Sequence, residues 1–489
     1  MTIEKSDNIA VKPTMCVGWE EIQPGTWYRK LDCMERLLYF YEHIDPNLTQ
    51  WTPTVGLKLP KTSQYSVKEI QAAWISLRLD YPTIACTIEN GKGMQYQILT
   101  KDELVRWAEK TVHIHRFGKS AREMAISATI PESSTLHFFP ESQELAILIR
   151  HELCDGVGCL ILANKLLQNL RIKPRIDTIG EEIARLPSPT IDLLNDKSSM
   201  APGIIERADY IVGLYCDTNA IALQTRQQKD TQKAIPTLPQ GRVEHQFSER
   251  ESQAILDACR AKKITVTTAI WAAQAKAALE HSGDTAGNLI SFLPINLRNE
   301  IKSCSSNNVE TKDPPANNTI IFALTNLPVA ENDDFVDWAK MAQRDLHSWR
   351  FGENNIRLFE LTCKALEKKM ATDVAAGIMH PARFFLTNVG ISENYIREPV
   401  EDVWLNLMVS TPESSALVVL TTHRKLRFTA CYNRAFFHDN QVKDYMAMVV
   451  SHLKNGLGLR VFVDKIEAST RSESYETVAR IPRVAICNL

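Results

Sequence analysis

The sequence predicts a mixed α/β protein that is built from two similar halves. The chain has 489 residues, 44% of them hydrophobic, which supplies a large buried core and suggests two or three domains. Strand-like and helix-like patterns alternate twice, and a polar stretch with two prolines separates the two alternations. We therefore predict a first subdomain over residues 1–225, a crossover linker over 226–242 and a second subdomain over 243–489.

The first half opens with two helices. Apolar residues within Leu31–Leu38 fall on one helical stripe. Ser66 and Glu69 form a capping box, because the hydroxyl and the carboxylate can satisfy unpaired amides at a helix start. The residues that follow have helical spacing on one face: Ile70, Ala73, Trp74 and Leu77.

A buried strand and a further helix complete the predicted first half. The run Leu145–Ile149 is short and continuously apolar, as is typical of a strand that is covered on both faces. Gly156 and Gly158 follow this run, and a helical stripe that begins at Leu160 comes next. The sequence therefore predicts a strand, a glycine-containing turn and a helix in direct succession.

The second half has the same alternating character. A capping box at Ser248–Glu251 and an alanine-rich stripe from Val266 to Ala277 predict two helices. Three segments indicate strands: Leu289–Leu297, Phe384–Leu386 and Leu426–Tyr432. Apolar spacing from Val442 to Leu453 predicts a closing helix that ends near Gly456. The stretch 299–318, with its paired Asn and Pro residues, is expected to be an exposed loop or an insertion.

Composition excludes several classes of protein. The 56 Lys and Arg residues nearly cancel the 58 Asp and Glu residues, so no overall positive field exists that would hold a nucleic acid. The 11 cysteines lack C-x-x-C spacing and predict reduced thiols. No signal peptide, membrane span, P-loop or dinucleotide motif is visible. We expect a cytoplasmic protein without a membrane span or a nucleic-acid partner.

The most informative segment is Arg150–Gly158 (RHELCDGVG). It places His151 at the end of a buried strand, Asp155 four positions later, and glycines before a helix. Ligands usually bind at strand ends in α/β sheets, and an imidazole with a pKa near 6.5 can accept a proton at neutral pH. A His and an Asp at this spacing also occur together by chance. The motif indicates a catalytic site because it lies between a predicted buried strand and a predicted helix.

Residues 151–156 resemble the H-x-x-x-D-G signature of the condensation-domain superfamily. That superfamily includes chloramphenicol acetyltransferase, the plant BAHD acyltransferases, peptide-synthetase condensation domains and fungal trichothecene-type acetyltransferases. Further segments are similar in order and spacing: Leu31–Phe40, Ser66–Ile88, Ile264–Leu279, Ser291–Arg298 and Phe385–Gly390. The likeness covers residues 30 to 460. It implies two chloramphenicol-acetyltransferase-like mixed-sheet subdomains that form a pseudo-dimer with a central tunnel.

The resemblance also implies roles for particular residues. His151 would be the general base, which takes a proton from a hydroxyl as that hydroxyl attacks an acyl thioester, without an acyl-enzyme. Asp155 would be turned away from the substrate and paired with Arg298, and Gly156 would let the acceptor reach the base. Thr387 and Asn388 are candidate donors to the oxyanion, although they can equally well simply end a strand.

One family segment is missing. The D-F-G-W-G string of the plant enzymes does not occur, and Glu401–Trp404 is only a weak echo of it. This departure favours the fungal natural-product branch over a typical plant enzyme.

Cys154 beside His151 is expected to be a packing residue rather than a nucleophile. His113 and His115 share a strand face, but without a third ligand at a readable spacing we expect no metal site.

The leading hypothesis is an acyl-CoA-dependent O-acyltransferase that acts on a hydroxyl of a specialised natural product. Acyl-CoA, with acetyl-CoA first, would be a co-substrate rather than a bound cofactor, and its binding residues stay unassigned. A small-molecule alcohol would be the other partner of a monomeric enzyme. The alternatives are a carrier-protein-dependent or amide-forming condensation enzyme, reuse of the fold for cyclisation or proton transfer, and a non-catalytic binding protein.

Overall fold

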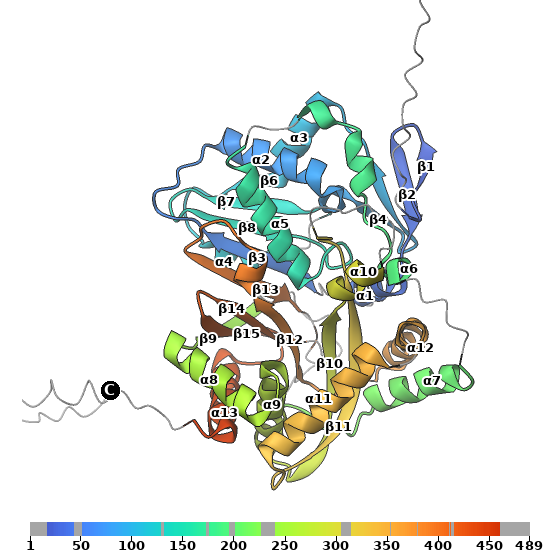
Figure 1. Cartoon of the computed structure of the whole chain (residues 1–489), viewed down its shortest axis with the longest axis vertical. Helices are drawn as coiled ribbons and strands as arrows, with labels where there is room; N and C mark the ends of the chain where they lie inside the picture. Colours follow the sequence, from blue (N-terminus) through green and yellow to red (C-terminus); the bar gives the residue numbers. More distant parts are fainter. Residues whose placement is uncertain are drawn as a thin grey trace, which may run out of the picture.

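The chain folds into two lobes that meet along a broad interface. This computed structural model describes residues 17–43, 51–128, 132–172, 176–194, 201–225, 240–304, 314–352, 354–378, 380–409, 411 and 415–459. In Figure 1 the first half of the chain lies above and most of the second half lies below. Buried apolar residues from both lobes belong to one continuous core, so the lobes pack as parts of a single folded unit.

The N-terminal lobe holds a five-stranded sheet, β13-β3-β8-β7-β6, and a smaller four-stranded sheet, β1-β2-β5-β4. Its strands are β1 (Glu20–Gln23), β2 (Thr26–Lys30), β3 (Thr52–Lys58), β4 (Thr87–Glu89), β5 (Gly93–Gln97), β6 (Val112–Ile114), β7 (Thr135–Phe139) and β8 (Glu144–Leu148). Its helices are α1 (Cys33–His43), α2 (Val67–Asp80), α3 (Lys101–Thr111), α4 (Ala121–Ala125), α5 (Gly156–Asn169) and α6 (Thr190–Leu194). Helices α2 and α5 pack against each other, and α5 covers β3.

The C-terminal lobe holds a four-stranded sheet, β12-β14-β15-β9, and the long hairpin β10-β11. Its strands are β9 (Gln240–Gln246), β10 (Ala286–Asn296), β11 (Ile320–Ala330), β12 (Phe384–Ile391), β14 (Ser415–Thr422) and β15 (Lys425–Asn433). Its helices are α7 (Ile204–Tyr215), α8 (Glu249–Lys262), α9 (Val266–Ser282), α10 (Arg298–Cys304), α11 (Phe335–Phe351), α12 (Asn355–Ala375) and α13 (Asp439–Leu457). Most of the predicted elements of this half are present.

Two segments cross between the lobes. Strand β13 (Asp402–Met408) follows β12 in sequence, yet it pairs antiparallel with β3 in the sheet of the N-terminal lobe, where it appears in orange beside the blue strand (Figure 1). Helix α7 lies before the predicted linker, yet it packs on α12 and β11 of the C-terminal lobe. The halves of the sequence therefore exchange elements in space.

Capping signals placed the helix starts correctly. Ser66 and Ser248 each accept from the third helical amide, and the glutamate at that position returns a hydrogen bond to the cap. Helix α13 ends at Leu457, next to Gly456 as predicted, and its C-cap Gly458 takes the left-handed conformation. Strand β9 begins at Gln240, so the last residues of the predicted linker are strand, and residues 226–239 lie outside the described part of the chain.

The prediction for residues 299–318 was wrong in part. Residues 298–304 form helix α10, and the described residues after it are not an exposed loop, because Ala316, Asn317 and Asn318 are buried. Residues 305–313 lie outside the described part. The buried residues contact the turn that carries His151, so this segment belongs to the candidate site.

Candidate active site

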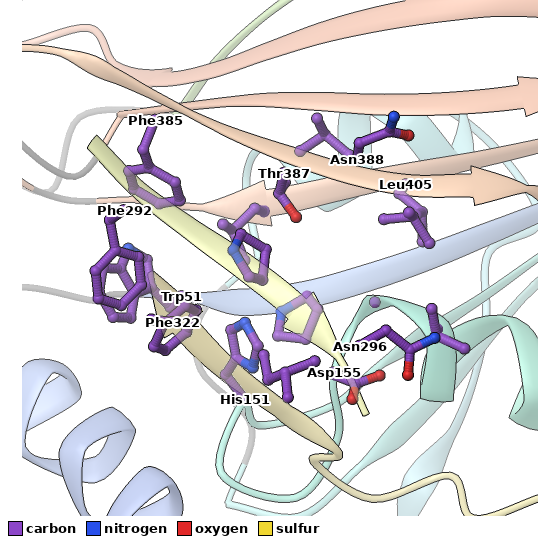
Figure 2. A pocket seen from close by; sticks show the side chains of 18 of the residues that line it. Trp51, His151, Asp155, Phe292, Asn296, Phe322, Phe385, Thr387, Asn388 and Leu405 are labelled. Atoms are coloured by element: carbon purple, nitrogen blue, oxygen red, sulfur yellow. The ribbon is translucent and has the colours of Figure 1, made fainter. Parts of the chain in front are cut away.

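A cavity of about 90 Å³ lies between the lobes and reaches His151. The N-terminal lobe contributes the turn after β8 and the residues around the start of β3, while the C-terminal lobe contributes β10, β11 and β12 (Figure 2). Strand β13 adds Leu405, Asn406 and Leu407 to the wall. Residues from both lobes thus line one shared space, and the central tunnel implied by the resemblance stays a prediction.

His151 lies at this cavity on the turn between β8 and α5. Its side chain is half-buried and its Nδ1 atom is fully buried, so Nε2 is the ring nitrogen available to a ligand in the cavity. Burial lowers the pKa of His151 below its usual range, and nearby groups, among them its own backbone and the Asp155 carboxylate, oppose that effect. A neutral imidazole at neutral pH can act as a general base.

Asp155 is buried and has four hydrogen-bond donors around its carboxylate. It is the N-cap of α5 and accepts from Gly158 N at 2.7 Å. Arg298 binds it in bidentate fashion, with Nη1–Oδ2 and Nη2–Oδ1 distances of 3.0 Å. Thr319 N completes the set at 2.8 Å. The predicted ion pair is therefore present, and the carboxylate is used in holding the turn rather than facing a ligand.

Residues 315–319 hold the turn of the N-terminal lobe from the opposite side. Arg298 Nε donates to Pro315 O and Nη2 donates to Asn317 O, each at 2.9 Å. Asn318 Nδ2 donates to the backbone carbonyl of His151. Sequence reasoning missed this segment because Pro and Asn are common in exposed loops.

Glycine at position 158 is required by this contact. A Cβ there would lie 1.9 Å from the carbonyl oxygen of Ala316, so backbone of the two lobes meets where no side chain fits. At Gly156 a Cβ would lie 3.0 Å from Val389 of β12, a tight contact on the cavity wall. The glycines of the motif therefore allow the C-terminal lobe to approach the His151 turn closely.

The two candidate oxyanion donors lie on opposite sides of β12, because successive strand residues alternate. Figure 2 shows the Thr387 hydroxyl directed into the cavity and Asn388 directed away from Thr387. The Thr387 hydroxyl has no hydrogen-bond partner among the described residues. Asn388 Nδ2 donates to Thr267 Oγ1 at 2.9 Å, and its Oδ1 accepts from Gly390 N at 3.0 Å. Both residues line the cavity, and Thr387 is the one whose hydroxyl is directed into it, whereas the Asn388 amide is bonded to Thr267 and Gly390.

Cys154 points away from the cavity. Its side chain is fully buried, and its Sγ donates to Ala316 O at 3.0 Å. Burial raises the pKa of the thiol well above its usual value, so a thiolate nucleophile is disfavoured. The eight described free cysteines are all buried.

Two groups of described residues have metal-ligand chemistry: Cys216, Asp373 and His380, and Glu42, His43 and Glu152. Lys369 Nζ contacts both oxygens of Asp373, at 2.5 and 2.6 Å. Arg150 Nη2 contacts Glu42 at 3.3 Å and Glu152 at 2.8 Å. A cationic side chain therefore already neutralises carboxylate in each group, which weakens the case for a metal.

The histidine pair noted in the sequence has a third member. His137 of β7 stacks between His113 and His115, and its Nδ1 lies 2.9 Å from His115 Nε2. Burial lowers the pKa of His137 to about 3. The ring nitrogens of His137 are both occupied, since Thr135 Oγ1 contacts Nε2 at 3.0 Å. None of these three histidines lines the cavity.

No family model matches the chain. "Acetyltransferase pigO" of Monascus ruber is 26% identical over 272 residues, which cover 53% of this chain and 58% of that protein. "O-acetyltransferase pigM" of Monascus ruber is 21% identical over 473 residues, which cover 91% of this chain and 88% of that protein. "Azaphilone biosynthesis cluster protein M" of Aspergillus terreus is 23% identical, covering 64% of this chain and 77% of that protein.

Solved structures share the fold over most of the chain. The trichothecene 15-O-acetyltransferase TRI3 from Fusarium sporotrichioides has a TM-score of 0.72 at 16% identity, covering 92% of this chain and 99% of that chain. The cyclization-docking bidomain of the peptide synthetase EpoB from Sorangium cellulosum has a TM-score of 0.60 at 12% identity, covering 88% and 85%. No described helix has the length and apolarity to cross a membrane. The predicted fold is confirmed: the chain has the mixed α/β architecture of TRI3 and of condensation-type domains.

Proposed function

We propose that the chain is an O-acyltransferase that moves an acyl group, acetyl first, from coenzyme A to a hydroxyl of a specialised metabolite. The observation that carries the proposal is an accessible, neutral imidazole in a cavity between two lobes, with a free hydroxyl donor from β12 in the same cavity. The acetyltransferase names of two sequence relatives support the reaction class, and the azaphilone biosynthesis cluster in the name of the third supports a polyketide-type acceptor.

The proposed reaction is direct transfer. His151 Nε2 removes the proton of the acceptor hydroxyl while its oxygen bonds to the thioester carbonyl carbon. The Thr387 hydroxyl donates a hydrogen bond to the oxyanion of the tetrahedral intermediate. When the intermediate collapses, the C–S bond breaks, the thiolate leaves, and the proton on His151 passes to the sulfur. Asp155 and Arg298 act as positioning residues that hold the turn.

The first experiment measures release of free thiol from acetyl-CoA in the presence of a panel of polyketide alcohols. Replacement of His151 by Ala is expected to lower kcat by about 10²–10⁴-fold because proton transfer is lost. Thermal unfolding of the variant should match the parent protein. Unchanged turnover in His151→Ala would exclude His151 as the general base. If only carrier-bound thioesters react, the acyl donor is a carrier protein and not CoA.

A further inference from the structure

Four aromatic side chains gather at one end of the cavity. Trp51, Phe292, Phe322 and Phe385 lie together on one side of His151, whereas Asp155 and Asn296 lie on the other (Figure 2). Their rings are in direct contact, with the centroids of Phe292 and Phe322 3.6 Å apart and the centroids of Trp51 and Phe385 5.8 Å apart. The cavity is therefore apolar at one end and polar at the other.

The aromatic end is closed by further rings among the described residues. Tyr41 packs behind Trp51 at 4.6 Å between centroids, and Tyr215 packs behind Phe292 at 6.1 Å. All four wall residues and both tyrosines are buried. Arg383 stacks over Tyr215 at 4.8 Å and adds a further layer. A group that enters from His151 towards this end thus meets a wall several side chains deep.

The available volume is small. A cavity of about 150 Å³ lined by apolar side chains accommodates a benzene molecule, whereas this cavity has about 90 Å³. Closely packed interiors resist overfilling, so a larger group can enter only if side chains move. The space fits a group of a few non-hydrogen atoms next to the base, but not a long chain.

We propose that Trp51, Phe292, Phe322 and Phe385 form an acyl-length wall that restricts the enzyme to short acyl groups. The inference rests on the proposed function, because it concerns the thioester that this cavity would receive. The acyl carbonyl would lie between His151 and Thr387, and the alkyl tail would point to the aromatic end. An alkyl tail has no polar atom to satisfy there. The three phenylalanines of the wall offer no polar group, and the Trp51 indole N–H is the one donor among the four side chains, so an oxygen-rich acceptor would leave most of its hydroxyls unpaired.

Phe385 offers a test with a matched control on the same strand. Phe384 and Phe385 are adjacent on β12 and are equally buried, at 7% exposure each. Phe385 faces the cavity, whereas Phe384 stacks on Tyr445 at 5.3 Å between centroids and does not line the cavity. Phe385→Ala should extend the apolar end, while Phe384→Ala removes the same atoms elsewhere. Phe385→Leu is a milder variant that retains more of the packing.

The experiment compares kcat/KM for acetyl, butyryl, hexanoyl and octanoyl thioesters, presented both on CoA and on N-acetylcysteamine. The parent protein should strongly prefer acetyl. Phe385→Ala, or Phe385→Leu if the alanine variant does not fold, should raise the hexanoyl-to-acetyl ratio by about tenfold or more. Phe384→Ala should leave that ratio unchanged.

The outcomes separate the two proposals. If the parent protein uses acetyl and octanoyl groups equally well, acyl transfer stands and the acyl-length wall is wrong. An equal rise of the ratio in Phe384→Ala and Phe385→Ala would also overturn the wall, because the effect would then come from general loosening. If no thioester of any length reacts on either carrier, the proposed function fails and the inference that rests on it falls too.

Discussion

At the scale of single residues, the site depends on how His151 is held. No carboxylate among the described residues is hydrogen-bonded to the buried Nδ1 of the ring, and both oxygens of Asp155 are used by Arg298 and by backbone amides. Instead, Asn318 binds the backbone carbonyl of His151 and Arg298 fixes the turn below it. The position of His151 at the end of a buried strand could be predicted from the sequence. The contact with Asn318 could not, because Asn318 lies 167 residues away in a run that is typical of loops.

The pH dependence follows from the burial of His151. Because the pKa of His151 is lowered, the ring stays unprotonated to lower pH than a free imidazole with a pKa of about 6.5. Activity is therefore retained as pH falls from neutral to about 6.5 and is lost only below that value. We expect kcat/KM, measured from about pH 5 to 8, to show its acid midpoint under 6.5. A midpoint above that value would contradict a buried neutral base.

The hydroxyl of Thr387 provides a second test at this scale. Thr387→Val keeps the shape of the side chain but removes its donor, so kcat should fall by about 10²–10³-fold with little change in KM. Thr387→Ser keeps the donor and should retain most of the activity. Steady-state kinetics of the two variants test whether the Thr387 hydroxyl stabilises the oxyanion. Equal activity of the valine and serine variants would show that it does not.

At the scale of elements, local signals were reliable and long-range ones were not. The helices that begin at Ser66 and Ser248 were predicted because capping boxes act within four residues. The burial of residues 316–318 was missed because the Asn317 carbonyl and the Asn318 Nδ2 bond to partners that are distant in the sequence. Thr387 and Asn388 could not be distinguished in the sequence, since the side of β12 that faces the cavity depends on its pairing with β14.

The start of α5 yields a prediction about stability. Asp155→Asn keeps the cap but leaves the buried guanidinium of Arg298 without its counter-ion, which should cost about 3–5 kcal/mol of unfolding free energy. Asp257 and Arg260 form an exposed pair on α8, so Asp257→Asn is a matched control that should change little. Chemical denaturation of both variants measures the difference. Equal stability of Asp155→Asn and the parent would contradict the role of the pair.

At the scale of the whole molecule, the lobes are joined by β13. Trp404 lies over Gly56 of β3, where a Cβ would come within 1.9 Å of the indole. Arg122 and Arg242 lie over the same indole, each at 5.1 Å from its centroid. The sequence indicated two halves, but pairing between residues some 350 positions apart has no local signature, so this crossing strand could not be predicted.

The crossing strand predicts that the lobes unfold together. Calorimetry of the parent protein should give one transition in which the calorimetric and van't Hoff enthalpies agree. Trp404→Ala removes a fully buried side chain at the crossing, so it should lower stability by about 3–5 kcal/mol and broaden or split the transition. Trp404→Phe should preserve a single transition. Two resolved transitions in the parent protein would show that the lobes are independent.

The backbone contact between Gly158 and Ala316 also limits how such enzymes can be recombined. A chimera joined between residues 226 and 239 would take the His151 turn from one parent and the segment that contacts this turn from another. This contact tolerates no additional atom. If the two parents differ in the length of the segment before residue 316, the backbones at positions 158 and 316 would no longer meet. Productive crossovers should therefore transfer residues 315–319 and β13 together with the His151 turn, even though these pieces are far apart along the gene.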